Sequence, residues 1–155
     1  MLTSTSTTAQ SERLRSIPLF AGLSQPGLRH VAAAAAEVEV PPGRLIIERG
    51  QPGSGIFVIL EGTVSVELPG RVVSLGPSQV VGELSMLAPG ARRSARVRAE
   101  TRVRCLALSR SSVDDLLATE PGFAAAVAET AALRAPGSER ALRRLDRRRR
   151  LQPCC

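Results

Sequence analysis

The feature that most constrains the fold of this chain is a series of short apolar runs between residues 37 and 108, separated by turn-forming residues. Within the runs, apolar and polar side chains tend to alternate, which is typical of half-buried β-strands. Glycine and proline separate the runs, as at Pro41-Pro42-Gly43 and Gly76-Pro77, and both favour tight turns. We expect eight strands: Glu37–Val40, Leu45–Glu48, Ile56–Leu60, Thr63–Leu68, Val72–Leu75, Val80–Val81, Ala95–Ala99 and Val103–Leu108.

Eight short strands with this punctuation predict a closed roll or barrel. Alternating runs flank the dipeptide Glu61-Gly62, so the sequence predicts a β-hairpin at that point.

Helical patterns precede and follow the strands. Residues Leu14–Phe20 predict a short helix that ends near Pro18, and Ser24 with Pro26 predicts the start of a second helix that reaches about Ala36. After the last strand, either Ser109 or Ser111 begins a helix.

Pro121 predicts the start of a final helix that ends near Arg134, before the break at Pro136-Gly137. Residues Glu139–Arg150 form either a further helix or a solvated basic tail.

Length and composition predict one domain in three parts. The chain has 155 residues, of which 43% are hydrophobic, enough for one core. Residues 1–11 are rich in Ser and Thr, which predicts a disordered N-terminus. Residues 12–135 are expected to form the domain, and residues 136–155 are expected to form an Arg-rich tail. No apolar run approaches the length of a transmembrane helix or a secretion signal, so the cytoplasm is the expected compartment.

The charge is concentrated at the end of the chain. The net charge is +7, and residues 135–155 contribute +5 of it, from seven arginines and two acidic residues. Such a tail is suited to non-specific contact with nucleic acid or with anionic lipid.

Residues 82–95 carry the chemistry that points to a ligand. Gly82 opens a short helical turn, Glu83 follows it, and Arg92-Arg93-Ser94 returns ten residues later. Backbone amides at such a turn and an arginine fork suit phosphate, whereas a carboxylate can accept a hydrogen bond from a ribose hydroxyl.

This segment resembles the phosphate-binding cassette of the cyclic-nucleotide-binding domain family. The resemblance covers about residues 14–134, and three further motifs carry it: Pro18-Leu19-Phe20, Gly50-Gln51-Pro52-Gly53 in the second hairpin, and Ile59-Leu60-Glu61-Gly62-Thr63-Val64. It implies a mainly β jelly-roll, or double-stranded β-helix, with N-terminal helices and C-terminal lid helices.

The resemblance implies a role for each residue of the cassette. Glu83 accepts from the ribose 2′-hydroxyl, Gly82 allows close backbone approach, and the amides of Leu84 and Ser85 point at the phosphate. Arg93, rather than its neighbour Arg92, is the expected phosphate partner, and Ser94 and Ala95 complete the cassette. Ser94 leaves the choice between cAMP and cGMP open.

Three residues outside the cassette's centre have less definite roles. Arg96 replaces the threonine that is usual in the family, and it either stacks on the purine or faces water. Val72 is a candidate for the apolar wall around base and ribose, together with its neighbour Val73 and with Leu84. Arg134 either caps the base, as the resemblance to prokaryotic channel-type domains implies, or is an exposed arginine at a helix end.

The leading hypothesis is a regulatory sensor for cAMP, or for cGMP in its place, that needs no cofactor and acts through an unknown protein effector or a homodimer. The alternative is a Crp/Fnr-type transcription regulator, or a remnant of one without the helix-turn-helix, whose basic tail touches nucleic acid. An enzyme is not expected, because the single histidine, His30, cannot supply a metal site or a base beside Ser94.

Overall fold

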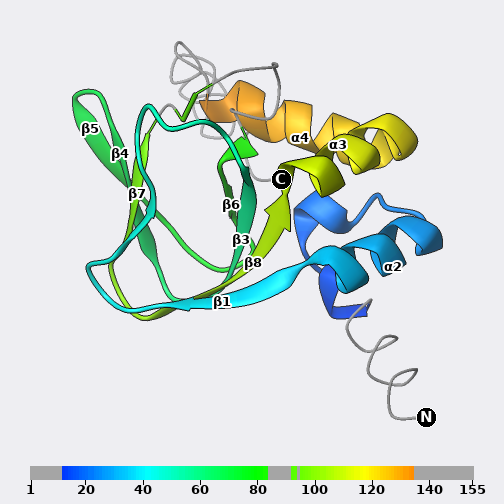
Figure 1. Cartoon of the computed structure of the whole chain (residues 1–155), viewed down its shortest axis with the longest axis horizontal. Helices are drawn as coiled ribbons and strands as arrows, with labels where there is room; N and C mark the ends of the chain where they lie inside the picture. Colours follow the sequence, from blue (N-terminus) through cyan, green and yellow to red (C-terminus); the bar gives the residue numbers. More distant parts are fainter. Residues whose placement is uncertain (1–11, 84–91, 94, 135–155) are drawn as a thin grey trace, which may run out of the picture.

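The structure is a computed structural model that describes residues 12–83, 92–93 and 95–134, with backbone only for residues 131–134. It confirms the expected fold class, a mainly β roll with helices before and after it (Figure 1). The strands of the described part are β1 (Ala36–Val40), β2 (Leu45–Ile47), β3 (Gly55–Glu61), β4 (Val64–Leu68), β5 (Arg71–Leu75), β6 (Val80–Val81), β7 (Arg96–Ala99) and β8 (Val103–Ser109). The helices are η1 (Pro18–Phe20), α2 (Gln25–Ala34), α3 (Arg110–Thr119) and α4 (Pro121–Arg134).

Within the described residues the strands form two antiparallel sheets, with the orders β1-β8-β3-β6 and β2-β7-β4-β5. The helices lie beside the first sheet, and the second sheet lies on the far side of the roll (Figure 1). Apolar side chains of both sheets meet between them in a buried cluster that includes Ile59, Val64, Val81, Val97 and Cys105. We call this cluster the roll core.

The predicted hairpin at Glu61-Gly62 is wrong, because β3 and β4 belong to different sheets. The chain turns a corner there: Gly62 adopts a φ of +87°, and a Cβ on it would collide with the carbonyl of Arg102. Thr63 then pairs with the corner between β7 and β8, since its N–H donates to Thr101 Oγ1 at 3.0 Å. β3 and β4 therefore form one bent ribbon that pairs along β8 and β7.

The motif at residues 50–53 does not join a hairpin either. β2 pairs with β7, whereas β3 pairs with β8 and β6, so this segment also crosses from one sheet to the other. A local sequence pattern indicates where a strand ends, but it does not indicate which sheet takes the next strand.

The N-terminal helices differ in extent from the prediction. Residues 12–15 are helical, and a separate 3₁₀ turn begins at Pro18, which takes the first helical position instead of ending a helix. The Ser24 hydroxyl caps α2 as expected, accepting from the N–H of Gly27 at 3.2 Å. α2 ends at Ala34, because Ala36 pairs with Ala107 of β8 and so begins β1.

The C-terminal helices begin where the sequence predicts. Of the two candidate caps, Ser109 is the one used, and its hydroxyl accepts from the N–H of Ser112. α4 begins at Pro121, as expected from the preference of proline for a first helical turn.

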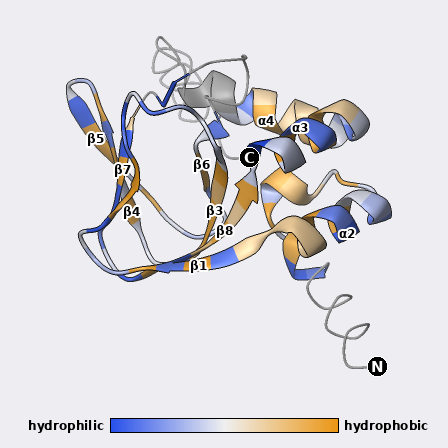
Figure 2. Cartoon of the chain, viewed as in Figure 1, coloured by the Kyte–Doolittle hydropathy of each residue, from blue (hydrophilic) through white to orange (hydrophobic). Residues whose placement is uncertain are grey.

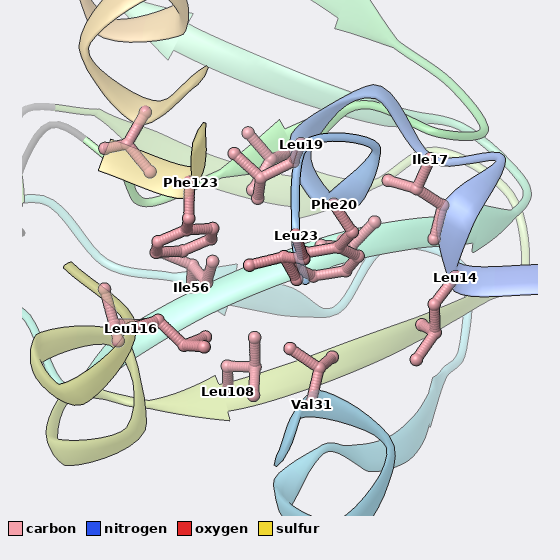
Figure 3. Packing of buried hydrophobic residues seen from close by; sticks show 14 of the residues in the cluster. Leu14, Ile17, Leu19, Phe20, Leu23, Val31, Ile56, Leu108, Leu116 and Phe123 are labelled. Carbon is pink, nitrogen blue, oxygen red and sulfur yellow. The ribbon is translucent and has the colours of Figure 1, made fainter. Parts of the chain in front are cut away.

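A second buried cluster joins the helices to the outer face of the first sheet. Phe20 of η1 and Phe123 of α4 stack with ring centroids 6.3 Å apart, and Ile56, Leu108 and Leu116 pack around them (Figure 3). Apolar residues run along β3 and β8 and along the helices beside them (Figure 2). We call this cluster the helix-side core.

A buried carboxylate ties the junction of α3 and α4 to the start of α2. Glu120, 9% exposed, accepts hydrogen bonds from the Ser24 N–H at 3.2 Å and from the Ser24 hydroxyl. The two ends of the described chain are therefore joined by polar contacts as well as by the stacked phenylalanines.

The proposed parts at residues 1–11 and 136–155 lie outside the described residues, so the three-part division stays a prediction. None of the helices in the described part combines the length and apolar character needed to cross a membrane.

Candidate functional site

The site begins where β6 ends. Val81 packs in the roll core, and the next residue, Gly82, adopts a φ of +93°, a left-handed conformation that favours glycine. A Cβ at this position would collide with Nη1 of Arg93 and would approach the carbonyl oxygen of Gly55 to 3.1 Å. Gly82 therefore lets the backbone pass close to the arginine, and its predicted close approach to a ligand stays a prediction.

Glu83 and Arg93 are both buried, which is rare for charged side chains. Glu83 is 1% exposed and Arg93 is 6% exposed. The guanidinium of Arg93 donates from Nη1 to the carbonyl oxygen of Gly82, at 3.1 Å. The structure thus brings together the two residues that the sequence predicts to hold the sugar and the phosphate.

The charges of these groups act on each other. Burial lowers the pKa of the Arg93 guanidinium from its ordinary value, while the nearby Glu83 carboxylate raises it and Arg110 lowers it. Arginine keeps its proton under these conditions. The site therefore holds a positive guanidinium withdrawn from water, which suits an anionic ligand group.

The segment that follows β2 positions Arg93. The backbone N–H of Arg93 donates to the carbonyl of Gln51 at 2.8 Å, and the Gly50 N–H donates to the carbonyl of Arg93 at 3.0 Å. Arg92 forms an isolated bridge with Pro52, and its exposed side chain donates to the carbonyl of Gly50 at 2.8 Å. Of the two adjacent arginines, Arg93 is the one directed into the protein.

Arg96 faces the outside of the second sheet. Its Nε donates to Glu48 Oε1 at 2.9 Å, and Glu67 lies 3.8 Å from its Nη1. The hydrogen bond from Arg96 lowers the pKa of the Glu48 carboxyl below its ordinary value. Of the two roles left open for Arg96, the structure favours the solvent-facing one, with carboxylates as partners.

Val72, the candidate for the apolar wall, belongs to neither buried cluster of the described residues. Val72 is 66% exposed, and it is the neighbouring Val73 that packs against the roll core. Side chains alternate along a strand, so the two valines lie on opposite faces of β5. Ala95 is buried, 9% exposed, just before β7.

Leu84, Ser85 and Ser94 lie outside the described residues, so their roles stay predictions. Arg134 is the last residue of α4, and only its backbone is described. Whether it caps a base also stays a prediction.

Sequence reasoning missed Arg110, the first residue of α3. Its backbone N–H donates to the carbonyl of Ser54 at 2.8 Å, and its Nη1 donates to the carbonyl of Gly53 at 3.3 Å. Its charge also acts on Arg93. No sequence pattern indicates this contact, because Arg110 follows the cassette by 15 residues and meets it only through the fold.

Comparison with known proteins points to a single family. The family model of the cyclic nucleotide-binding domain matches residues 37–120 of the sequence, which are more than half of the chain. A cyclic nucleotide-gated potassium channel of Mesorhizobium japonicum is 36% identical over 115 residues, which cover 74% of this chain and 32% of the channel. A CRP-like cAMP-activated global transcriptional regulator of Mycobacterium tuberculosis is 28% identical over 109 residues, covering 66% of this chain and 48% of the regulator.

A solved structure agrees with this assignment. The regulatory subunit of a cAMP-independent protein kinase A from Trypanosoma brucei superposes with a TM-score of 0.71 at 27% identity, covering 90% of this chain and 53% of that one. This chain spans about a third of the length of the channel relatives it matches, from 27% to 34%.

Proposed function

The chain belongs to the cyclic nucleotide-binding domain family, and from that premise we propose that it is a regulatory sensor that binds a 3′,5′-cyclic nucleotide, with cAMP as the first candidate. The observation that carries the proposal is the shared burial of Glu83, which directly follows Gly82, and of Arg93, which donates to the Gly82 carbonyl. A buried carboxylate beside a buried guanidinium matches a ligand that has a ribose hydroxyl at one end and a phosphate at the other.

Each group has a distinct task in this proposal. The Arg93 guanidinium leaves the carbonyl of Gly82 and donates to the cyclic phosphate, and a hydrogen bond to a charged group of this kind contributes about 1.5–3 kcal/mol. Glu83 accepts from the 2′-hydroxyl. The amides of Leu84 and Ser85, with Ser94 and Ala95, complete the phosphate contacts.

The family alone does not fix the base. The Mycobacterium tuberculosis relative is named cAMP-activated, whereas the Trypanosoma brucei regulatory subunit is named cAMP-independent. Ligand binding must therefore be tested with several nucleotides. We propose that α3 and α4 close over the bound nucleotide and that Arg134 caps the base. A ligand can drive closure only if it binds the closed form better than the open form, and a contact with Arg134 would supply that difference in affinity.

Calorimetry on the full chain with cAMP, cGMP and non-cyclic AMP tests the proposal. We expect a dissociation constant in the micromolar range or below for one cyclic nucleotide, and no comparable binding of AMP. Arg93→Gln is expected to weaken binding by roughly ten to more than a hundred fold, which corresponds to the free energy of the lost contact.

Arg92→Gln is the matched control, since it removes the same charge from the exposed neighbour. It is expected to leave the affinity nearly unchanged. The proposal is wrong if no cyclic nucleotide produces heat, or if the Arg92 variant loses as much affinity as the Arg93 variant.

The regulatory output is proposed to pass to a protein effector or to a second copy of this chain. The likeness to the Mycobacterium tuberculosis regulator favours a second candidate, transcriptional regulation with the Arg-rich residues 135–155 in contact with nucleic acid. Mobility-shift assays at increasing salt separate the two, because counterion release makes such binding fall steeply with salt.

We propose no enzymatic activity. The sequence contains one histidine, His30, and within the described residues no three His, Cys, Asp or Glu side chains are placed to hold a metal ion. Incubation with cAMP and analysis of the products by chromatography tests this, and formation of AMP would contradict it.

A further inference from the structure

A pocket lies on the outer face of the first sheet, away from Glu83 and Arg93, neither of which lines it. It opens between the residues just before η1, the end of α2 and strands β1, β3 and β8, and its volume is about 450 Å³. That volume is within the range of about 300–1,000 Å³ that is typical of small-molecule sites. Its apolar surface includes Leu14, Ala32, Ala35, Leu60 and Leu106.

Two small side chains line this space: Ala32 of α2 and Ala35, the residue that follows the helix. Ala32 and Ala35 pack against the edge of the helix-side core, opposite the partly buried Leu60 of β3 and Leu106 of β8. Protein interiors are ordinarily packed without voids, and larger side chains at these two positions would fill the space. The small size of Ala32 and Ala35 is therefore consistent with the open space beside them.

Two arginines, Arg13 and Arg104, are among the residues that line the same pocket. Arg104 Nη2 lies 3.2 Å from Glu61 Oε1, and Arg104 Nε is buried without a hydrogen-bond partner among the described residues. Since a guanidinium has five N–H donors, this single ion pair leaves Arg104 with unused donor capacity. Arg13, on the rim, has no ion-pair partner within the described part of the chain.

The carboxylates of the pocket are less favourably placed to bind a charged ligand group. Glu61 already pairs with Arg104, and 66% of its side chain is exposed. Glu37 is an exposed residue of β1 and so remains hydrated. Arginine forks bind planar carboxylates through paired hydrogen bonds, and they bind more strongly where water is partly excluded, as it is at Arg104, whose side chain is 30% exposed.

We propose that this pocket binds a small apolar molecule that carries one carboxylate. The apolar body lies on Leu60, Leu106, Ala32 and Ala35, and the carboxylate binds Arg104 and Arg13. The ligand is distinct from the cyclic nucleotide and binds the opposite side of the first sheet. The proposal does not depend on the nucleotide site, so either can fail while the other stands.

Naphthalene-2-carboxylate is a suitable probe, because its rings are flat, apolar and smaller than the pocket. We titrate the full chain with it while recording amide chemical shifts by NMR, and we repeat the titration with the neutral isostere naphthalene-2-carboxamide and the cationic 2-naphthylmethylamine. Shifts are expected at Leu60, Leu106 and Ala35, with Gly82 and Arg93 unchanged. The carboxylate is expected to bind about tenfold more tightly than the amide.

Two variants locate the carboxylate. Arg104→Met keeps the apolar stem and is expected to weaken carboxylate binding to the level of the amide. Arg102→Met is the matched control. Arg102 directly precedes β8 and, like Arg104, forms an ion pair with a glutamate, Glu39, but it does not line the pocket. Ala32→Leu, which fills the pocket without removing a charge, is expected to abolish binding of all three probes.

The proposal is overturned if the carboxylate does not bind at about 1 mM, if the amide or the amine binds as tightly as the carboxylate, or if Arg102→Met weakens binding as much as Arg104→Met. Shifts confined to Gly82 and Arg93 would also overturn it, because they would place the probe in the nucleotide site. If Arg104→Met does not fold, the probe series and Ala32→Leu still decide the question.

Discussion

Glu120 provides the sharpest test of how the helices are held to each other. Its buried carboxylate accepts from both the N–H and the hydroxyl of Ser24, the residue that caps α2. Glu120→Ala removes both acceptors at once and leaves the backbone of the α3–α4 junction unchanged. We predict a loss of stability without any change in the strand arrangement.

The magnitude follows from the two hydrogen bonds and the burial. Hydrogen bonds to a charged group contribute about 1.5–3 kcal/mol, and Glu120 is only 9% exposed. Ser24 is itself exposed, so water replaces part of the loss at its end of the contact. We therefore expect a decrease in unfolding free energy of about 1.5–3 kcal/mol in total, or about 3–12 °C in Tm for a chain of this length.

Urea denaturation followed by circular dichroism measures the change, with Glu129→Ala as the control. Glu129 is an exposed glutamate of α4, so its removal is expected to change stability by less than about 0.5 kcal/mol. Ser24→Ala is expected to cost about 1 kcal/mol for the lost cap in addition to the lost contact.

A double-mutant cycle then isolates the pair itself. Residues in direct contact give interaction energies of about 0.5–3 kcal/mol, so Ser24→Ala and Glu120→Ala together are expected to cost less than the sum of the two. Strict additivity, or a Glu120→Ala variant as stable as Glu129→Ala, would refute the reasoning.

Three further predictions concern the site and its surroundings. Gly82→Ala is expected to cost about 1–2 kcal/mol, because of its positive φ, and to weaken cAMP binding by displacing Arg93; unchanged affinity in calorimetry would contradict this. The pKa of Glu48 is expected to rise toward its ordinary 4.5 in Arg96→Gln when followed by NMR. Since the folded pKa is lowered, the stabilisation by this pair is present above the unfolded pKa and is lost as pH falls through the folded one. Arg134→Gln is expected to speed cAMP release in stopped-flow measurements and to spare association, and an unchanged release rate would show that Arg134 does not cap the base.

Much of the fold could be predicted because the residues that end its strands and begin its helices act locally. Glycine and proline mark the strand ends, and Ser24, Ser109 and Pro121 begin helices for reasons contained within one turn of chain. The corner at Gly62 could not be predicted, because its alternating flanks look the same whether the next strand pairs with the last or crosses to another sheet. The predicted end of α2, near Ala36, was wrong by two residues for a similar reason, because the pairing of Ala36 with β8 is non-local.

The candidate site divides in the same way. Gly82, Glu83 and Arg93 are close in sequence, so a motif indicates them, and the structure brings them together. Arg110 comes from another element, and the exposure of Val72 depends on which face of β5 meets the roll core. Neither can be derived from a pattern within a few residues. Burial, a property of the whole fold, is also what distinguishes Arg93 from Arg92.

The pairing of the first strand with the last has a consequence for biosynthesis. Val40 of β1 meets Val103 of β8, and Ala36 meets Ala107, so β1 leaves the ribosome long before its partner. At about 5–20 residues per second, the intervening stretch takes about 3–13 s to translate. During that time β1 lacks its partner strand. Its alternating glutamates, Glu37 and Glu39, keep the strand charged, and charge of this kind discourages association with other chains.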